Sequence, residues 1–190
     1  MDIYFAFYIY FVVLAIASFS SLYRFKYLDT PSRIFSVLVC LSFLSEILAV
    51  IVGRKFHNNE VVYAFYELAE FALTSMYFNY SIDVFKQRHI GFYVAIAGLV
   101  LGSINILLVQ RISSRNSFFM LFESIVIIAM ALFAFFRFLL KNEDFKLHTY
   151  RHFWFISILI FFGASPFSIG AFTTTSSSPS KTKTGLSTFL

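Results

Sequence analysis

Nearly all the charged residues of this 190-residue chain lie outside six long apolar runs. The runs hold 20 to 24 residues each and are Ile3–Tyr23, Ile34–Gly53, Val61–Ile82, Ile90–Gln110, Ser117–Leu140 and His152–Phe172. Only five of the 25 charged residues fall inside them. A helix needs about 20 residues to cross the hydrocarbon core of a bilayer, and continuous apolar runs are not the alternating pattern of a barrel strand. The sequence therefore predicts an all-α, polytopic transmembrane bundle of about six helices over residues 1–172.

Composition excludes the common soluble classes. Apolar residues make up 59% of the chain and charged residues 13%, with a mean hydropathy of +0.78. A soluble domain has about a quarter of its residues charged. The net charge of +5 comes from Lys and Arg in the short connectors between the runs. That placement favours the lipid bilayer as partner, including contact with anionic lipid, and argues against nucleic-acid binding.

Lys and Arg are also distributed unevenly between the connectors. Nine belong to the first, third and fifth connectors, with Arg137 counted at the fifth, and six to the second, the fourth and the carboxyl-terminal stretch. Positive residues favour the cytoplasmic side, so we expect the amino terminus outside in a bacterial inner membrane. The first run is expected to be an uncleaved helix, because Asp2 and no Lys or Arg precedes it, unlike a signal peptide.

Residues 173–190 differ in composition from the rest of the chain, since 11 of these 18 residues are Ser or Thr. Two interpretations stay open. One is a flexible polar tail. The other is a frame change near Gly163 that replaces the native end of the last apolar run, which Pro166 interrupts.

Four glutamates lie inside the apolar runs at similar depths from one face of the membrane. They are Glu46, Glu67, Glu70 and Glu123, and Asn105 falls in the same zone. Counting from the nearest run ends at 1.5 Å per residue places the carboxylates roughly 9 to 14 Å below the predicted outer face. A charged group at such depth is costly, so we expect these side chains to face the bundle interior or a water-filled cavity.

Two interpretations of this acidic group stay open. The first is a functional pocket for a ligand, a proton or a cation, in which some carboxyls are protonated or share protons. The second is structural, with protonated glutamates forming hydrogen bonds between helices. A metal site is not predicted, because Glu67 and Glu70 lack the Glu-x-x-His spacing of a di-iron bundle.

Two further patterns complete the predictions. Gly98 and Gly102 form a GxxxG pair that predicts close packing within the bundle, with homodimerisation as the alternative. The motifs GxSxG, HExxH, GxGxxG and the P-loop are absent from the sequence, so neither an enzyme nor a bound cofactor is predicted.

Two stretches, LSFLSEIL (Leu41–Leu48) and YAFYELAEFALTSMYF (Tyr63–Phe78), resemble small uncharacterised bacterial multi-pass membrane proteins. More loosely, residues 1–162 resemble the seven-helix membrane regions that precede histidine kinases, although this sequence lacks a seventh helix and an output domain. The resemblance implies a sensor-like or accessory module that acts with a signalling partner or as a homo-oligomer, and it assigns no site residues. The leading hypothesis is thus a small sensing or binding module with an intramembrane acidic pocket. A proton- or cation-coupled transporter or channel subunit and a structural membrane subunit are the alternatives.

Overall fold

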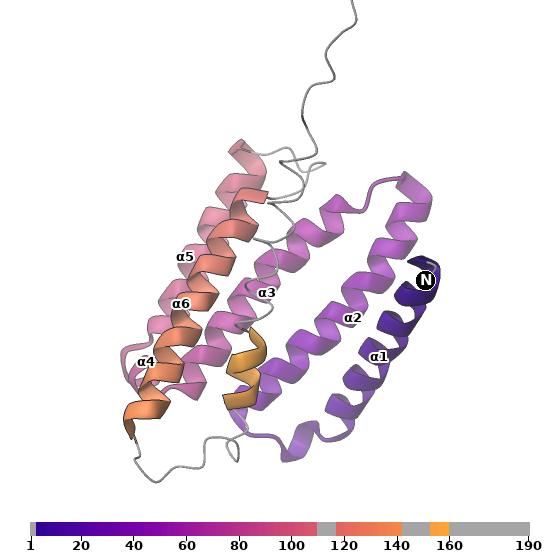
Figure 1. Ribbon diagram of the computed structural model, residues 1–190. Helices are drawn as coiled ribbons and strands as arrows, with labels where there is room; N and C mark the ends of the chain where they lie inside the picture. The colour runs from indigo at the N-terminus through magenta and orange to yellow at the C-terminus, as the bar shows by residue number, and fades with distance from the viewer. Residues whose placement is uncertain (1–2, 110–116, 142–152, 160–190) are drawn as a thin grey trace, which may run out of the picture.

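The computed structural model describes residues 3–109, 117–141 and 153–159, and these residues form helices without any strand (Figure 1). In chain order the elements are α1 (Ile3–Tyr23), the 3-10 turn η1 (Phe25–Tyr27), α2 (Thr30–Phe56), α3 (Glu60–Ser81), α4 (Asp83–Arg88), α5 (Ile90–Ile104), the π-helical segment η2 (Asn105–Val109) and α6 (Ser117–Lys141). Residues 153–159 form a further short helix. The predicted all-helical fold is confirmed. Residues 173–190 and most of the sixth apolar run lie outside the described residues.

Helix α2 is longer at both ends than its apolar run. Asp29 has extended backbone and precedes the helix, and Pro31 occupies the first turn, where its missing N–H costs no hydrogen bond. At the other end His57 adopts a left-handed conformation with φ of 55°, and its N–H donates to the carbonyl of Gly53 at 3.0 Å. Apolar periodicity could not show these polar first and last turns, which add four residues before Ile34 and three after Gly53.

The expected connector between the third and fourth runs is itself a short helix, α4. Ile82 has extended backbone and ends α3, and Asp83 then begins α4. Acidic residues at the start of a helix and basic residues at its end complement the helix dipole, and Lys86 and Arg88 lie in the last turn of α4. The chain then reverses at His89, which has a φ of 52°, so α5 returns alongside α3 (Figure 1).

Helix α3 is the centre of the bundle. It contacts α2 on one side and α4, α5 and α6 on the other, while α1 packs against α2 (Figure 1). The α3 sequence carries the polar stripe of Glu67, Glu70 and Thr74. A helix with carboxyl groups at membrane depth is stabilised when neighbouring helices cover it, which explains its central position.

Three helical segments are long and apolar enough to cross a membrane, namely Thr30–Phe56, Ile90–Leu108 and Phe118–Leu140. Large apolar side chains also cover the outside of the bundle. Leu107 and Leu108 are 76% and 81% exposed, and Phe118 is 64% exposed. Contiguous exposed apolar surface of this kind is typical of a surface that contacts lipid. Six spanning segments remain a prediction.

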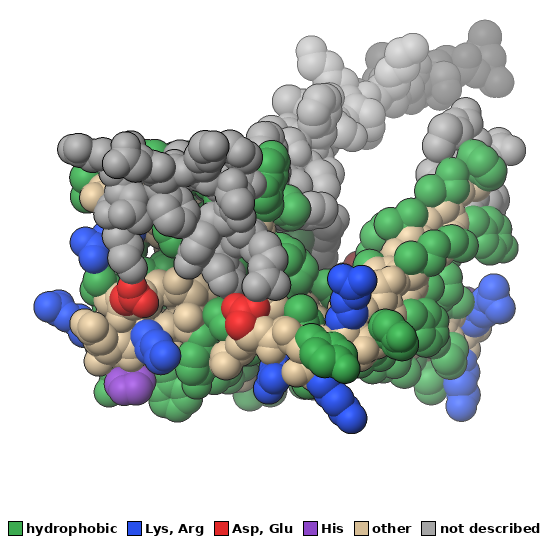
Figure 2. Space-filling model, turned by 90° about the horizontal axis from the view of Figure 1, so that it is seen from below, with side chains coloured by type: hydrophobic (Ala, Val, Ile, Leu, Met, Phe, Trp, Pro, Cys, Tyr) green, Lys and Arg blue, Asp and Glu red, His purple; other side chains and the backbone are tan. Residues whose placement is uncertain are grey.

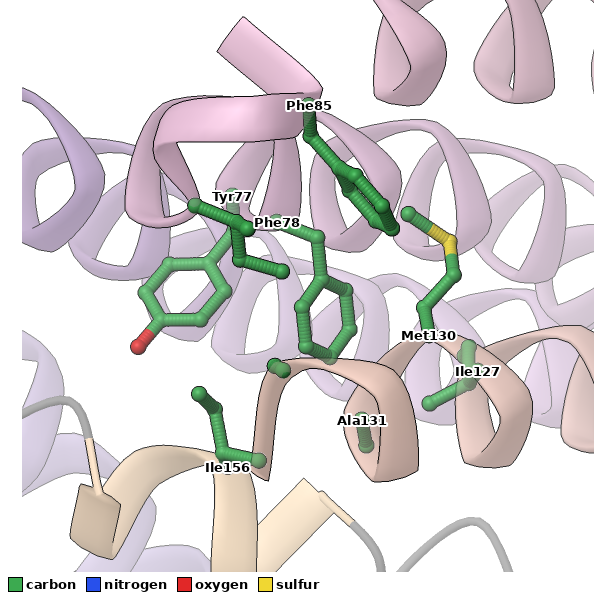
Figure 3. Packing of buried hydrophobic residues seen from close by; sticks show 9 residues of the cluster. Tyr77, Phe78, Phe85, Ile127, Met130, Ala131 and Ile156 are labelled. Carbon is green, nitrogen blue, oxygen red and sulfur yellow. The ribbon is translucent and has the colours of Figure 1, made fainter. Parts of the chain in front are cut away.

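Two buried clusters hold the central helices together. The larger one joins α3, α4, α6 and residues 153–159 (Figure 3), and its members include Tyr77, Phe78, Phe85, Met130 and Ile156. The second cluster lies nearer the start of α3 and consists of Ala64, Leu68, Phe71, Ile106 and Phe119. In lipid such packing replaces the hydrophobic effect as the main force between helices.

A row of small residues allows α5 to approach α3 closely. Gly91, Ala95, Gly98 and Gly102 are all buried and share one face of α5. A Cβ atom at Gly98 would overlap the ring of Phe71, and a Cβ atom at Gly102 would overlap Leu68. A Cβ atom at Gly91 would overlap the carbonyl of Ser75. The GxxxG pair therefore faces α3 of the same chain, and Gly91 extends the row beyond the pair that the sequence indicated.

This contact yields the first testable prediction. Replacing Gly98 with Ala should lower the free energy of unfolding by about 1–3 kcal/mol, because the added methyl group has no space beside Phe71. The thermal unfolding midpoint of the detergent-purified protein measures the effect. Gly53→Ala is the matched control, since the nearest atom to its added Cβ is 3.7 Å away. Equal midpoints for the two variants would contradict the close approach of α3 and α5.

Candidate functional site

Three of the four predicted glutamates lie together where α3 meets α6. Glu67 and Glu70 are on α3, one helical turn apart, and Glu123 is on α6. Glu67 and Glu70 are the charged groups that act on Glu123 among the described residues, and both are acidic. We call Glu67, Glu70 and Glu123 the acidic cluster.

Glu123 is the most deeply buried member of the acidic cluster. Its side chain is 8% exposed, and its Oε1 atom has no hydrogen-bond partner among the described residues. Most buried polar atoms in proteins have a partner, because leaving one without costs about 1–3 kcal/mol. An unsatisfied carboxylate oxygen beside two further carboxyl groups is thus a destabilising arrangement, and such arrangements are typical of sites that bind something.

Tyr66 joins the acidic cluster to α2. Its hydroxyl interacts with the carboxyl group of Glu70 and lies 2.6 Å from the Oγ of Ser42. The Ser42 hydroxyl is also 3.0 Å from the carbonyl oxygen of Leu38. Tyr66 precedes Glu70 by one helical turn, so the two side chains lie on the same face of α3. A continuous set of hydroxyl and carboxyl groups therefore extends from α2 to α6.

Glu46 binds two tyrosines. The hydroxyl of Tyr10 on α1 donates to Oε1 of Glu46 at 3.2 Å, and the hydroxyl of Tyr63 on α3 donates to Oε2 at 3.3 Å. One carboxyl group thus links α1, α2 and α3. Glu46 is not among the groups that act on Glu123, but Tyr10, which donates to Glu46, also interacts with Glu70 of the acidic cluster.

Asn105 marks a change of helix type at the same end of the bundle. It follows the last residue of α5 and begins the π-helical segment Asn105–Val109, and its side chain is half-buried. The next residue, Ile106, packs against Leu68 and Phe119. Short π-helical segments within helices are frequent at functional sites. Sequence alone could not show this change, because the apolar pattern of the run continues through it.

The tyrosines are the site residues that the sequence did not indicate clearly. The chain holds 11 tyrosines, many of them near run ends, where an interfacial belt would also place them. The available signal was the spacing of Tyr66 and Glu70, which are one turn apart. Tyr10 gave no such signal, because its partner is on another helix.

Within the part of the chain that the structure describes, no group of three or more His, Cys, Asp or Glu side chains is arranged to hold a metal ion. Comparisons with protein-family models, with curated proteins and with solved structures each find no match for this chain.

The bonds of Glu46 give the second testable prediction. Tyr10→Phe and Tyr63→Phe should each lower the free energy of unfolding by about 0.6–2 kcal/mol, since each removes one hydrogen bond between helices. In a double-mutant cycle, each Tyr→Phe change should lower the free energy of unfolding little further once Glu46 is replaced by Gln or Leu. Tyr8→Phe, at an exposed position on α1, is the matched control. Strict additivity of Tyr10→Phe and Glu46→Leu would contradict the bond.

Proposed function

We propose that this chain is a small integral membrane module that binds a positively charged ligand, a proton or a cationic solute, at the acidic cluster of Glu67, Glu70 and Glu123. The observation that carries the proposal is the buried Oε1 atom of Glu123, which has no hydrogen-bond partner among the described residues, in a side chain on which two further carboxyl groups act. A proton or cation between these groups would satisfy that atom and reduce the repulsion between the carboxylates.

The proposal includes a multi-pass placement in a bacterial-type inner membrane with the amino terminus outside. Its support is the exposed apolar surface of the bundle and the position of the basic residues. The end that holds η1 and α4 carries several Lys and Arg side chains (Figure 2), among them Lys26, Lys86 and Arg88. Basic residues favour the cytoplasmic side, so the acidic cluster, near the opposite end of α3, would lie toward the outside. An outward binding site at one end of a membrane bundle suits a sensor-like module.

Coupled transport of protons or cations is the second candidate function. A specific observation favours it. Hydroxyl and carboxyl groups are distributed across four helices at a similar level, from Tyr10 on α1 and Glu46 on α2 to the acidic cluster on α3 and α6. Chains of such groups serve as proton pathways in transporters. Proton or sodium flux into liposomes that contain the purified protein distinguishes the two functions, because a binding module produces none.

A structural role for the acidic cluster predicts the opposite change in stability from a binding role. If Glu123 only joins helices, an apolar replacement removes a favourable contact and lowers stability. If Glu123 instead binds a ligand, the same replacement removes an unsatisfied buried oxygen and the repulsion of Glu123 with Glu67 and Glu70. Stability in the absence of the ligand should then not fall. Replacing buried charged groups with apolar ones of similar volume is often neutral or stabilising.

The third testable prediction follows. Glu123→Met should raise the free energy of unfolding by about 1–3 kcal/mol, because it removes the cost of the unsatisfied oxygen. At the same time it should abolish any stabilisation by the ligand. The measurement is thermal unfolding of the purified chain at acidic and neutral pH and with sodium, potassium and small organic ammonium ions. A ligand at 100 times its Kd stabilises the folded state by about 2.7 kcal/mol.

Two controls accompany this measurement. Glu60→Gln removes a negative charge from the first turn of α3 and should leave the ligand-dependent shift intact. Glu123→Gln keeps the shape of the side chain and should lose the shift. A Glu123→Met variant that is less stable than the wild type, together with wild-type curves that no cation or pH changes, would show that the acidic cluster is structural.

A further inference from the structure

A cavity lies at the end of the bundle opposite the acidic cluster. Its volume is about 370 Å³, and it is an open cavity lined by the end of α1, the start of α2 and the short helix of residues 153–159. Ala17, Val39 and the rings of Phe35 and Phe155 form its apolar walls. The two rings are 4.6 Å apart between centroids. Small-molecule sites have volumes of about 300–1,000 Å³ and are mainly apolar with few polar groups, so this cavity has the character of a ligand site.

The mouth of the cavity carries a polar group that lacks a partner. Ser32, in the first turn of α2, lines the cavity and is only 6% exposed. Its Oγ atom has no hydrogen-bond partner among the described residues.

The same mouth carries one cationic side chain, Arg24. Arg33, its neighbour across the connector, is bound instead to the connector itself. Its Nε donates to the carbonyl of Leu28 at 2.8 Å, and one of its terminal nitrogens donates to the carbonyl of Lys26 at 3.2 Å. Arg33 thus shapes the connector, and Arg24 is the basic group that lines the cavity. A guanidinium and a serine hydroxyl without a partner together favour a phosphate group.

The direction of the cavity relative to the helices identifies the rest of the ligand. From Arg24 the cavity extends along α1 to Ala17, and from Ser32 it extends along α2 to Val39. Both distances are seven residues, roughly 10 Å along a helix axis. The polar groups lie at the basic end of the bundle, and the apolar walls extend from there toward the middle of the predicted membrane. A molecule that matches both parts has an anionic head and an apolar chain.

We propose that this cavity binds one anionic phospholipid, with its phosphate at Arg24 and Ser32 and the first part of an acyl chain against Phe35, Val39 and Phe155. The cytoplasmic leaflet of bacterial and other membranes is anionic, and the basic end of the bundle is the end predicted to face it. The site is separate from the acidic cluster and would bind its lipid whether or not that cluster binds a cation.

Native mass spectrometry of the detergent-purified full chain with phosphatidylglycerol or phosphatidylcholine tests the proposal. We expect one phosphatidylglycerol molecule to stay bound at concentrations at which phosphatidylcholine does not. Arg24→Gln should weaken this binding about fivefold, in line with about 1 kcal/mol for one basic residue at an anionic membrane surface. Arg24→Lys should restore most of it. Val39→Phe should reduce the binding of both lipids, because it fills the apolar part of the cavity.

Lys55→Gln is the matched control, because Lys55 is an exposed basic residue in the last turn of α2, at the other end of the helix from Ser32. It should leave the bound lipid unchanged. Equal binding of the two lipids, or an equal effect of Arg24→Gln and Lys55→Gln, would overturn the proposal. Displacement of the lipid by soluble glycerol phosphate alone at similar concentrations would also overturn it, because the site would then recognise a free phosphate ester. Unchanged unfolding midpoints of the Arg24 variants in lipid-free detergent confirm that they fold.

Discussion

A carboxyl group inside a bilayer must find its polar partners within the protein, because hydrocarbon offers none. Glu67 and Glu70 lie near the middle of α3, and the arrangement of the bundle follows from this constraint. Helices α2, α5 and α6 surround α3, and the row of glycines on α5 allows one of these neighbours to approach closely. Helix α3, which carries the polar stripe, is consequently the helix with the most neighbours. The more apolar helices form the outer surface.

The sequence predicted the helices well, because charged residues are excluded from apolar runs by a large energetic cost. It also predicted that Glu67, Glu70 and Glu123 lie at a similar depth, since depth follows from counting residues along a helix. It did not predict their partners. Helical phase shows which face of α3 carries Glu70 but not which neighbour covers that face, and Tyr10 reaches Glu46 only through the packing of α1 on α2. In a chain with 28 phenylalanines and 11 tyrosines, no single aromatic residue indicates a special role.

The two sites that we propose differ in charge and lie toward opposite ends of the bundle. The acidic cluster takes a positive ligand near the middle of α3, in the half toward its start, and the cavity at Arg24 takes a negative head group near the start of α2. Helix α2 passes both, because Ser32 lines the cavity and Ser42 is bonded to Tyr66 beside the acidic cluster. If binding at one site affects the other, α2 is the continuous element that joins them, and the coupling would have to be reciprocal.

The central position of α3 is tested most directly by nitroxide labels placed along it in bilayers, one at a time, in a chain in which the single cysteine, Cys40, is replaced by Ser. Collisions with dissolved oxygen report how far lipid reaches each label. Phe65, which is 60% exposed, should show high oxygen accessibility, and labels at positions 67, 70 and 74 should show low accessibility. Oxygen accessibility that repeats every 3.6 residues along α3, with its minimum on the face of Glu67 and Glu70, would support the central position of α3. Equal oxygen accessibility at Phe65 and at the positions of Glu67 and Glu70 would contradict it.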